Sequence, residues 1–148
     1  MSQVSHPRVQ TEMERIRIAS VADRSGQILR NYLLDALTPR GIQGPELYVL
    51  SITLNEPRRE VSIRRDDTAS RLSYTASAAF TLHDTRQRRI LFAGSSSTET
   101  TYEVTGSEFA TLSGYASARD RALQDVSNDI RLQIATYFSG KAPPRLDP

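Results

Sequence analysis

The side chains that could perform acid–base or metal chemistry are few in this sequence. The two histidines, His6 and His83, are far apart, and neither has a second histidine or a cysteine at metal-ligand spacing. Asp66 and Asp67 are adjacent carboxylates, but neighbours in an extended chain point to opposite faces, which makes a poor acid–base pair. At a turn, such residues bond their own backbone instead. We therefore predict no metal site and no enzyme active site.

Two short segments could in principle bind phosphate. "GSSST", residues 94–98, superficially resembles a phosphate-binding loop, but it lacks the lysine and the following helix that such a loop needs. "ADRSG", residues 22–26, lies between a predicted strand and a predicted helix, where backbone N–H groups favour an anion. It contains only one glycine, however, and helix capping by Asp23 or Ser25 explains it.

Arginine placement is the remaining chemical signal. All but one of the 19 basic residues are arginines, which a genome rich in G and C would also favour. The forked guanidinium group of arginine can bind an anionic ligand with several phosphates. Alternatively, charged arginines at strand ends keep the protein soluble and prevent wrong strand pairing. The arginines form two clusters, the first at Arg58, Arg59, Arg64, Arg65 and Arg71, and the second at Arg86, Arg88 and Arg89.

Composition excludes several classes of protein. The net charge is only +2, neither arginine cluster lies on a predicted helix, and Tyr74 alone is an aromatic residue near the first cluster, so we expect no nucleic-acid partner. The absence of cysteine excludes a disulfide, a thiolate metal site and a cysteine nucleophile from this chain, and we expect no cofactor. No apolar run approaches the roughly 18 residues of a membrane helix, and no signal peptide is visible.

The first half of the chain alternates between strand and helix patterns. Residues 15–21 alternate as a strand, and residues 27–37 carry a broad apolar helical face that ends before Pro39 and Gly41. Residues 46–54 carry apolar side chains at both odd and even positions, so both faces are apolar, which is typical of a strand in the middle of a sheet. Pro57 interrupts this strand and indicates a bulge or an edge before the extended pattern resumes.

The second half is predicted to contain two further strands and a long helix. In the third strand Leu72, Tyr74, Ala76, Ala78, Phe80 and Leu82 share one parity, and the small or polar side chains of the other parity can face water or a flat partner. Residues 90–104 form the last strand, with Gly94 at a bulge or kink. Residues 105–115 remain unassigned, apart from a helical turn that Ser107 and Glu108 could cap. Residues 116–138 are helical, with a stripe formed by Ala118, Ala122, Val126, Ile130, Ile134 and Tyr137.

The predicted fold class follows from this order of strand, helix, three strands and helix. It is a two-layer α+β sandwich, in which two helices pack on one face of a four-stranded mixed sheet. With 148 residues the chain is long enough for one domain with its own core. We place that domain at residues 15–139, between a flexible N-terminal segment (1–14) and a flexible C-terminal tail (140–148).

Four segments carry a resemblance to a known family. They are "ADRSGQILRNYLLDALTPRG", "SIRRDDTASRLSYTASAAFTL", "SEFATLSGYASARDRA" and "DIRLQIATYF". In this order and spacing they resemble the lipopolysaccharide-assembly lipoproteins of the LptE family, in the form found in alphaproteobacteria. The resemblance runs from about Ile16 to Phe138, and the fold of that family matches the predicted one.

The resemblance implies a non-enzymatic protein of the outer membrane. Such proteins are lipid-anchored, face the periplasm, plug the large LptD β-barrel and help it to assemble, and the pair inserts lipopolysaccharide into the outer leaflet. Basic residues near the tip of the second hairpin are implied to bind lipopolysaccharide. In this sequence they correspond to Arg64 and Arg65, and we add the neighbouring Arg71. Familiar members carry another basic residue just ahead of the last helix, whereas this chain has none there before Arg119.

Two other interpretations stay open at this stage. The anchor would need a cysteine at the mature N-terminus, and we attribute its absence to a shortened chain. A protein of similar fold could instead serve as a periplasmic adaptor of another cell-envelope complex, which its co-purifying partner would reveal. An enzyme acting on an envelope phosphate or sugar depends only on the acidic and basic hairpin around Asp66 and Asp67.

Overall fold

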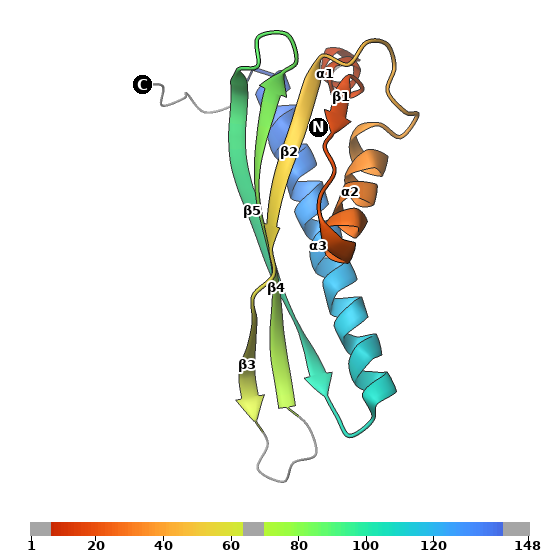
Figure 1. The fold of residues 1–148 in the computed structure, drawn as a ribbon, viewed down its shortest axis with the longest axis vertical. Helices are drawn as coiled ribbons and strands as arrows, with labels where there is room; N and C mark the ends of the chain where they lie inside the picture. Colours follow the sequence, from red (N-terminus) through yellow and green to blue (C-terminus); the bar gives the residue numbers. More distant parts are fainter. Residues whose placement is uncertain (1–6, 64–69, 141–148) are drawn as a thin grey trace.

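The fold is that of a curled mixed sheet with helices packed against it, as the sequence predicts (Figure 1). The computed structural model describes residues 7–63 and 70–140. Its elements are α1 (Pro7–Met13), β1 (Ile16–Ile18), α2 (Asp23–Leu37), β2 (Tyr48–Asn55), β3 (Arg58–Ile63), β4 (Ser70–Asp84), β5 (Ile90–Val104) and α3 (Glu108–Phe138). Within the described ranges no helix is long and apolar enough to cross a membrane.

The sheet is organised around β4. Strand β1 runs parallel to β2, which requires the α2 crossover between them. Strands β2 and β3 pair antiparallel with successive parts of β4, and β5 pairs with β4 along its other side from Val104 to Ile90. Because β1 is parallel and the other pairs are antiparallel, the predicted mixed sheet is confirmed.

Pro57 divides the predicted second strand into β2 and β3 without changing its register. The pairing of Asn55 with Ser77 continues in step to the pairing of Arg58 with Tyr74. Thr75 donates its backbone N–H to the Pro57 carbonyl at 3.0 Å, and proline has no N–H to return. The register shift lies farther along, between Glu60 and Ser62. Strand β3 pairs with β4 alone among the described strands, so Pro57 begins an edge segment rather than a bulge.

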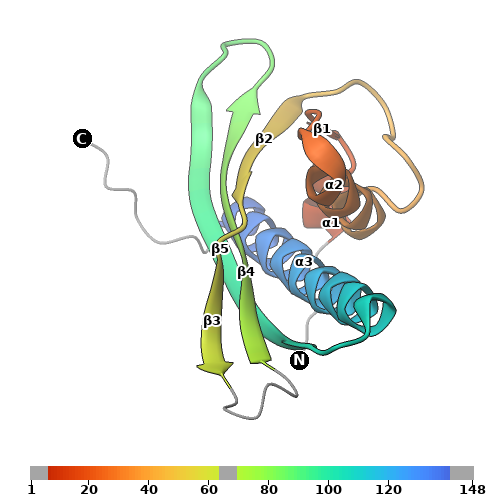
Figure 2. The ribbon, with the colours of Figure 1, turned by 60° about the horizontal axis from the view of Figure 1, so that its bottom comes forward.

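The core lies between one face of β4 and the helices. The alternate side chains of β4 that were predicted to be buried are buried from Tyr74 to Leu82. The predicted apolar stripe of α3 is fully buried from Ala118 to Ile134. Helix α3 packs on β5 and β4, and α2 packs on α3 and β1. Both helices lie on the same side of the sheet, so its other face has no helix over it (Figure 2).

Gly94 does not form the predicted bulge. It pairs with Phe80 in unbroken register, and the irregularity of this ladder lies at the end of β4, between Leu82 and His83. A Cβ atom at position 94 would lie 2.8 Å from Phe80 Cζ and 2.6 Å from Gln133 Oε1. Glycine is therefore required here because the Phe80 ring and the α3 side chain lie directly over the backbone.

Helix α3 begins eight residues before its predicted start. The Ser107 side chain accepts a hydrogen bond from the Ala110 N–H, which caps the helix at its observed first turn. Gly114 lies inside the helix, where an added Cβ would contact the Tyr102 Cβ at 3.6 Å. Residues 108–115 of the unassigned segment are thus part of one continuous 31-residue helix.

Helix α1 lies within the segment that was expected to be flexible. Val9 and Met13 are 3% and 0% exposed and belong to the hydrophobic core. Two apolar side chains four residues apart are too short a pattern to predict a helix. The domain boundaries remain predictions, and residues 141–148 of the predicted tail lie outside the described residues.

Candidate ligand-binding surface of the β3–β4 hairpin

The predicted site residues divide between described and undescribed parts of the hairpin. Arg64 and Arg65 lie outside the described residues, as do His6 and the pair Asp66 and Asp67. Arg71 lies near the start of β4 and forms an ion pair with Glu103 of β5 at 3.4 Å, both side chains being more than half exposed. An exposed pair of this length contributes little stability. The Arg71 guanidinium can therefore exchange this carboxylate for a ligand at small cost.

Arg58 and Arg59 lie at the start of β3 on opposite faces of the sheet. Arg58 pairs with Tyr74, whose side chain is in the core, and Arg59 pairs with Ser73. A pocket of about 310 Å³ is lined by Pro57, Arg58, Arg59, Ser73 and Thr75. The Ser73 hydroxyl already donates to the Glu99 carboxylate at 2.5 Å, so the guanidinium groups and the Thr75 hydroxyl are the donors that this pocket can offer to an oxyanion.

Three tyrosines meet on the helix-facing side of this hairpin. The Tyr74 and Tyr115 rings are 5.8 Å apart in an edge-to-face arrangement, and the Tyr102 and Tyr115 rings are 5.6 Å apart. Tyr74 is therefore not the lone aromatic residue that the sequence suggested. Tyr102 and Tyr115 come from β5 and α3, and only the tertiary packing brings them to β3.

Two arginines stack on the central ring of this cluster. The guanidinium carbons of Arg58 and Arg119 lie 4.7 Å and 5.1 Å from the Tyr115 centroid. A hydrogen bond with Tyr102 raises the pKa of Arg58 further above its usual range. Sequence reasoning missed Arg119 as a partner of the hairpin, because 60 intervening positions separate it from Arg58 and no local pattern links them.

Glu56 is the acid next to the tyrosine cluster, and its carboxylate is hydrogen-bonded to one of the rings. Its Oε2 accepts a hydrogen bond from the Tyr74 hydroxyl at 2.7 Å. Burial, followed by this hydrogen bond, raises the pKa of Tyr74. Tyr74 therefore remains a neutral phenol and a hydrogen-bond donor at physiological pH.

The second arginine cluster lies at the opposite end of the sheet. Strand β4 is 15 residues long, so roughly 45 Å of strand separates the two clusters. Here Asp84 Oδ1 accepts the backbone N–H groups of Arg86 and Gln87, and these bonds lower the pKa of Asp84. The structure explains this segment as a hydrogen-bonded turn and does not bring it to the hairpin.

The other candidates of the sequence have structural explanations. Asp23 Oδ1 accepts the Gly26 N–H at 3.0 Å, which confirms the capping role predicted for this segment. An added Cβ on Gly26 would lie 2.6 Å from Val21, so the helix start packs closely on the incoming chain. Among the described residues no group of three or more histidine or acidic side chains is placed to hold a metal.

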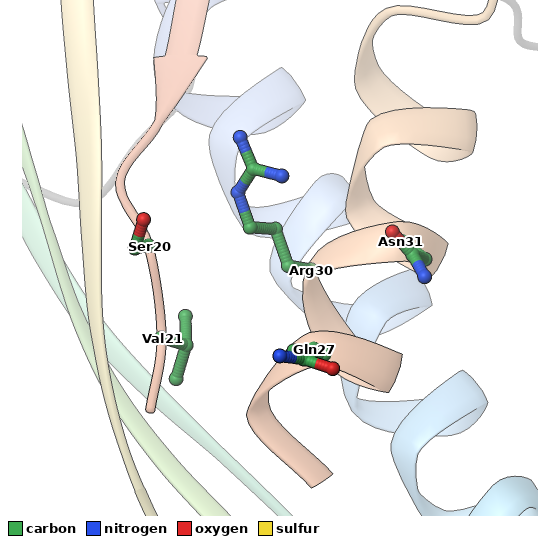
Figure 3. Close-up of a pocket in the computed structure, with 5 residues that line it drawn as sticks. All are labelled: Ser20, Val21, Gln27, Arg30 and Asn31. Carbon is green, nitrogen blue, oxygen red and sulfur yellow. The ribbon is translucent and has the colours of Figure 1, made fainter. Parts of the chain in front are cut away.

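A second pocket lies between the segment after β1 and helix α2 (Figure 3). Its volume is about 340 Å³, and it is lined by Ser20, Val21, Gln27, Arg30 and Asn31. Arg30 Nε donates to the Ile18 carbonyl at 3.2 Å, which ties α2 to β1. This arginine therefore has a structural role in joining the crossover helix to the edge of the sheet.

Comparison with known proteins gives one family match. The family model for LptE, described as "Lipopolysaccharide-assembly", matches residues 13–135. No curated protein matches the chain. The matched range extends from the end of α1 to the last turns of α3 and so includes the whole sheet.

Solved structures of bacterial proteins share the fold. A crystal structure from Caulobacter crescentus CB15 is 28% identical with a TM-score of 0.74, covering 92% of this chain and 98% of that one. A minor lipoprotein from Acinetobacter baumannii is 15% identical with a TM-score of 0.64, covering 82% and 92%. Lipoprotein B from Nitrosomonas europaea is 15% identical with a TM-score of 0.59, covering 95% of both chains. At 15% identity, the likeness shows the fold alone.

Proposed function

The chain belongs to the LptE family of lipopolysaccharide-assembly proteins, and we propose that it is the plug and assembly partner of an LptD-like β-barrel in the outer membrane. The family match over residues 13–135 is the observation that carries this proposal. The proposed role is non-enzymatic, as the family match implies. The helix-free face of the sheet, lined by small and polar side chains, suits contact with a flat partner surface.

We infer that the chain binds lipopolysaccharide through Arg64, Arg65 and Arg71. Strands β3 and β4, which flank Arg64 and Arg65 in the sequence, extend beyond the end of α2 (Figure 1). Arg71 is exposed and weakly paired, and the neighbouring pocket presents further guanidinium and hydroxyl donors. Phosphate groups are the natural partners of such forked donors.

We also propose attachment to the outer membrane by an N-terminal lipid, with the domain facing the periplasm. Two relatives of the same fold are described as lipoproteins, which supports this proposal. Helix α1 lies at the end of the sheet opposite to the β3–β4 hairpin (Figure 1). A lipid attached ahead of α1 and a ligand held at the hairpin would therefore occupy opposite ends of the molecule.

Affinity purification from the native host tests the barrel partnership. The gene is expressed with its natural N-terminus and a C-terminal tag, and the gently solubilised outer membrane is analysed by mass spectrometry. We expect a stoichiometric LptD-like barrel and a lipid-modified cysteine on the tagged chain. Recovery of a different envelope complex would favour the adaptor function, and recovery of the chain without a barrel would refute the partnership.

Charge reversal tests the ligand site separately. We expect the double variant R64E/R65E to bind lipopolysaccharide at least tenfold more weakly while its thermal unfolding is unchanged. The double variant R86E/R89E is the matched control, because it makes the same charge change at the opposite end of the sheet. Unchanged binding by R64E/R65E would remove these residues from the site.

A further inference from the structure

Two guanidinium groups from distant parts of the chain converge on one aromatic ring. Arg58 of β3 and Arg119 of α3 lie 4.7 Å and 5.1 Å from the Tyr115 centroid. Because both distances end at the same ring, the two guanidinium carbons are no farther apart than the two distances combined. The negative face of the ring attracts each cation, so the packing holds two like charges close together.

No carboxylate forms an ion pair with either guanidinium among the described residues. The ion pairs of the described chain are Arg17–Glu46, Arg40–Glu14 and Arg71–Glu103. Glu56 attracts Arg58 electrostatically, and its carboxylate accepts a hydrogen bond from Tyr74. Asp120 is next to Arg119 in the sequence and accepts a hydrogen bond from the Tyr32 hydroxyl at 2.6 Å. Within the described residues, Glu56 thus acts on Arg58 only from beyond ion-pair distance, and Arg119 has no ion pair.

The hydrogen-bonding capacity of Arg119 is also unfilled. Arg119 Nε is buried and has no hydrogen-bond partner, which is an unfavourable state for a charged donor. Arg58, by contrast, is exposed, and it lies on the helix-facing side of the sheet, opposite to Ser73 and Thr75. A ligand can therefore approach Arg58 from solvent, and an anionic oxygen would supply the missing acceptor.

The stacking explains why the site suits a phosphate rather than a general anion. A guanidinium that lies over an aromatic ring commonly has one face of its plane against the ring, which leaves the N–H groups at the edge of the plane to donate. Two N–H groups on such an edge match two oxygens of one phosphate, and holding the plane in place beforehand lowers the entropy lost on binding.

We propose that Arg58 and Arg119, held on Tyr115, form a second anion site that binds a phosphate group of a phosphorylated ligand. For a phosphorylated glycolipid this inference rests on the proposed function, since the glycolipid is then lipopolysaccharide. The shared chemistry is the phosphate, which a free phosphate compound also carries. The site uses other residues than the predicted Arg64 and Arg65, and Arg58 pairs with Tyr74 on the helix-facing side of the sheet.

Calorimetric titration of the purified 148-residue chain tests the site. The probes are lipopolysaccharide, lipopolysaccharide treated with phosphatase, and inorganic pyrophosphate. We expect R58Q/R119Q to bind lipopolysaccharide at least tenfold more weakly than the unmodified chain, and phosphatase treatment to reduce binding in the unmodified chain by a similar factor. Tyrosine fluorescence gives a second readout, since the chain has no tryptophan and Tyr115 lies within the site.

A matched control separates the site from general charge. R24Q/R121Q removes two exposed helical arginines and has the same net charge as R58Q/R119Q. We expect it to bind within twofold of the unmodified chain. Equal losses in both double variants would overturn the proposal, since binding would then depend on net charge alone. If R58Q/R119Q does not fold by circular dichroism, R58K/R119K keeps the charges but loses the planar fork, and we expect it to bind at least threefold more weakly.

The outcomes distinguish this inference from the proposed function. Binding of lipopolysaccharide that R58Q/R119Q leaves unchanged would overturn the second site and leave the proposed function intact. Binding of pyrophosphate through Arg58 and Arg119, with no binding of lipopolysaccharide, would support the phosphate site and refute the glycolipid ligand. Absence of binding to all three probes would overturn the inference, and the affinity purification would decide the barrel partnership independently.

Discussion

Substitution of Gly94 by alanine tests the packing between β4, β5 and α3. The added Cβ would lie 2.6 Å from Gln133 Oε1 and 2.8 Å from Phe80 Cζ. The amide of Gln133 is the end of a flexible side chain and can move away. The Phe80 ring cannot move freely, because it is 2% exposed and packs 5.9 Å from the Phe92 ring. The contact with Phe80 therefore determines the result.

The expected loss of stability follows from two opposing effects. Overpacking of this kind costs roughly 1–3 kcal/mol. Replacing glycine by alanine inside a strand regains about 0.5–1 kcal/mol of backbone entropy. Combined, the two ranges give roughly 0–2.5 kcal/mol. Because the Phe80 ring is held in place, we expect G94A to lower the free energy of unfolding by about 1–2 kcal/mol and the melting temperature by roughly 3–6 °C.

Urea unfolding followed by circular dichroism measures this difference, and two further variants isolate its cause. In G114A the new Cβ meets its nearest neighbour at 3.6 Å, so we expect about 0.5–1 kcal/mol of stabilisation from helix propensity. In an F80L background, where the ring is absent, G94A should cost less than half as much. A stable G94A, or an equal cost in both backgrounds, would refute the reasoning.

Three other substitutions test separate parts of the structure. Leu33 is fully buried on α2, so L33A should destabilise the protein by about 3 kcal/mol in urea unfolding, whereas N31A on the exposed face should have little effect. Y115A removes two ring–ring contacts and should cost about 2 kcal/mol, which thermal melting would detect. The folded state lowers the pKa of Asp84 below its ordinary value of 3.8. The ionised Asp84 carboxylate therefore stabilises the fold above pH 3.8, and this stabilisation is lost as the pH falls through the folded pKa. The D84N variant should accordingly lose less stability than the unmodified chain between pH 5 and pH 3, measured by urea unfolding.

The sequence was sufficient to predict elements with a long, regular pattern. The alternation from Leu72 to Leu82 and the stripe from Ala118 to Ile134 identified the central strand and the last helix with their buried faces. These patterns are reliable because burial acts on every second residue of a strand and every third or fourth residue of a helix.

The features that sequence analysis missed depend on contacts between distant elements. A glycine inside a strand suggested a bulge at Gly94. The structure shows instead that glycine is needed there because the Phe80 ring of the paired strand lies over the backbone. Gly114 lay in the segment that the sequence left unassigned, although it is an interior residue of α3. The stacking of Arg58 and Arg119 requires β3 and α3 to be docked in one register, and no local pattern specifies that docking.

The location of the candidate site was predicted only in part. The arginine-rich hairpin was recognised from composition and position, and Arg71 is exposed there as expected. The choice of Arg64 and Arg65 stays a prediction, because these residues lie outside the described part of the chain. The aromatic side chains that support Arg58 come from β5 and α3, so they could not be assigned to the hairpin beforehand.

The central position of β4 has a consequence for the order of folding. Strands β2, β3 and β5 all pair with β4, so β2 and β3 have no antiparallel partner until residues 70–84 have been synthesised. The β3–β4 and β4–β5 contacts are close in sequence and require little loop-closure entropy, whereas the parallel β1–β2 pair spans the α2 crossover. We therefore expect the three-stranded meander to form the folding nucleus and the N-terminal strand and crossover helix to dock last. Until then, the core face of the meander is exposed to other unfolded chains.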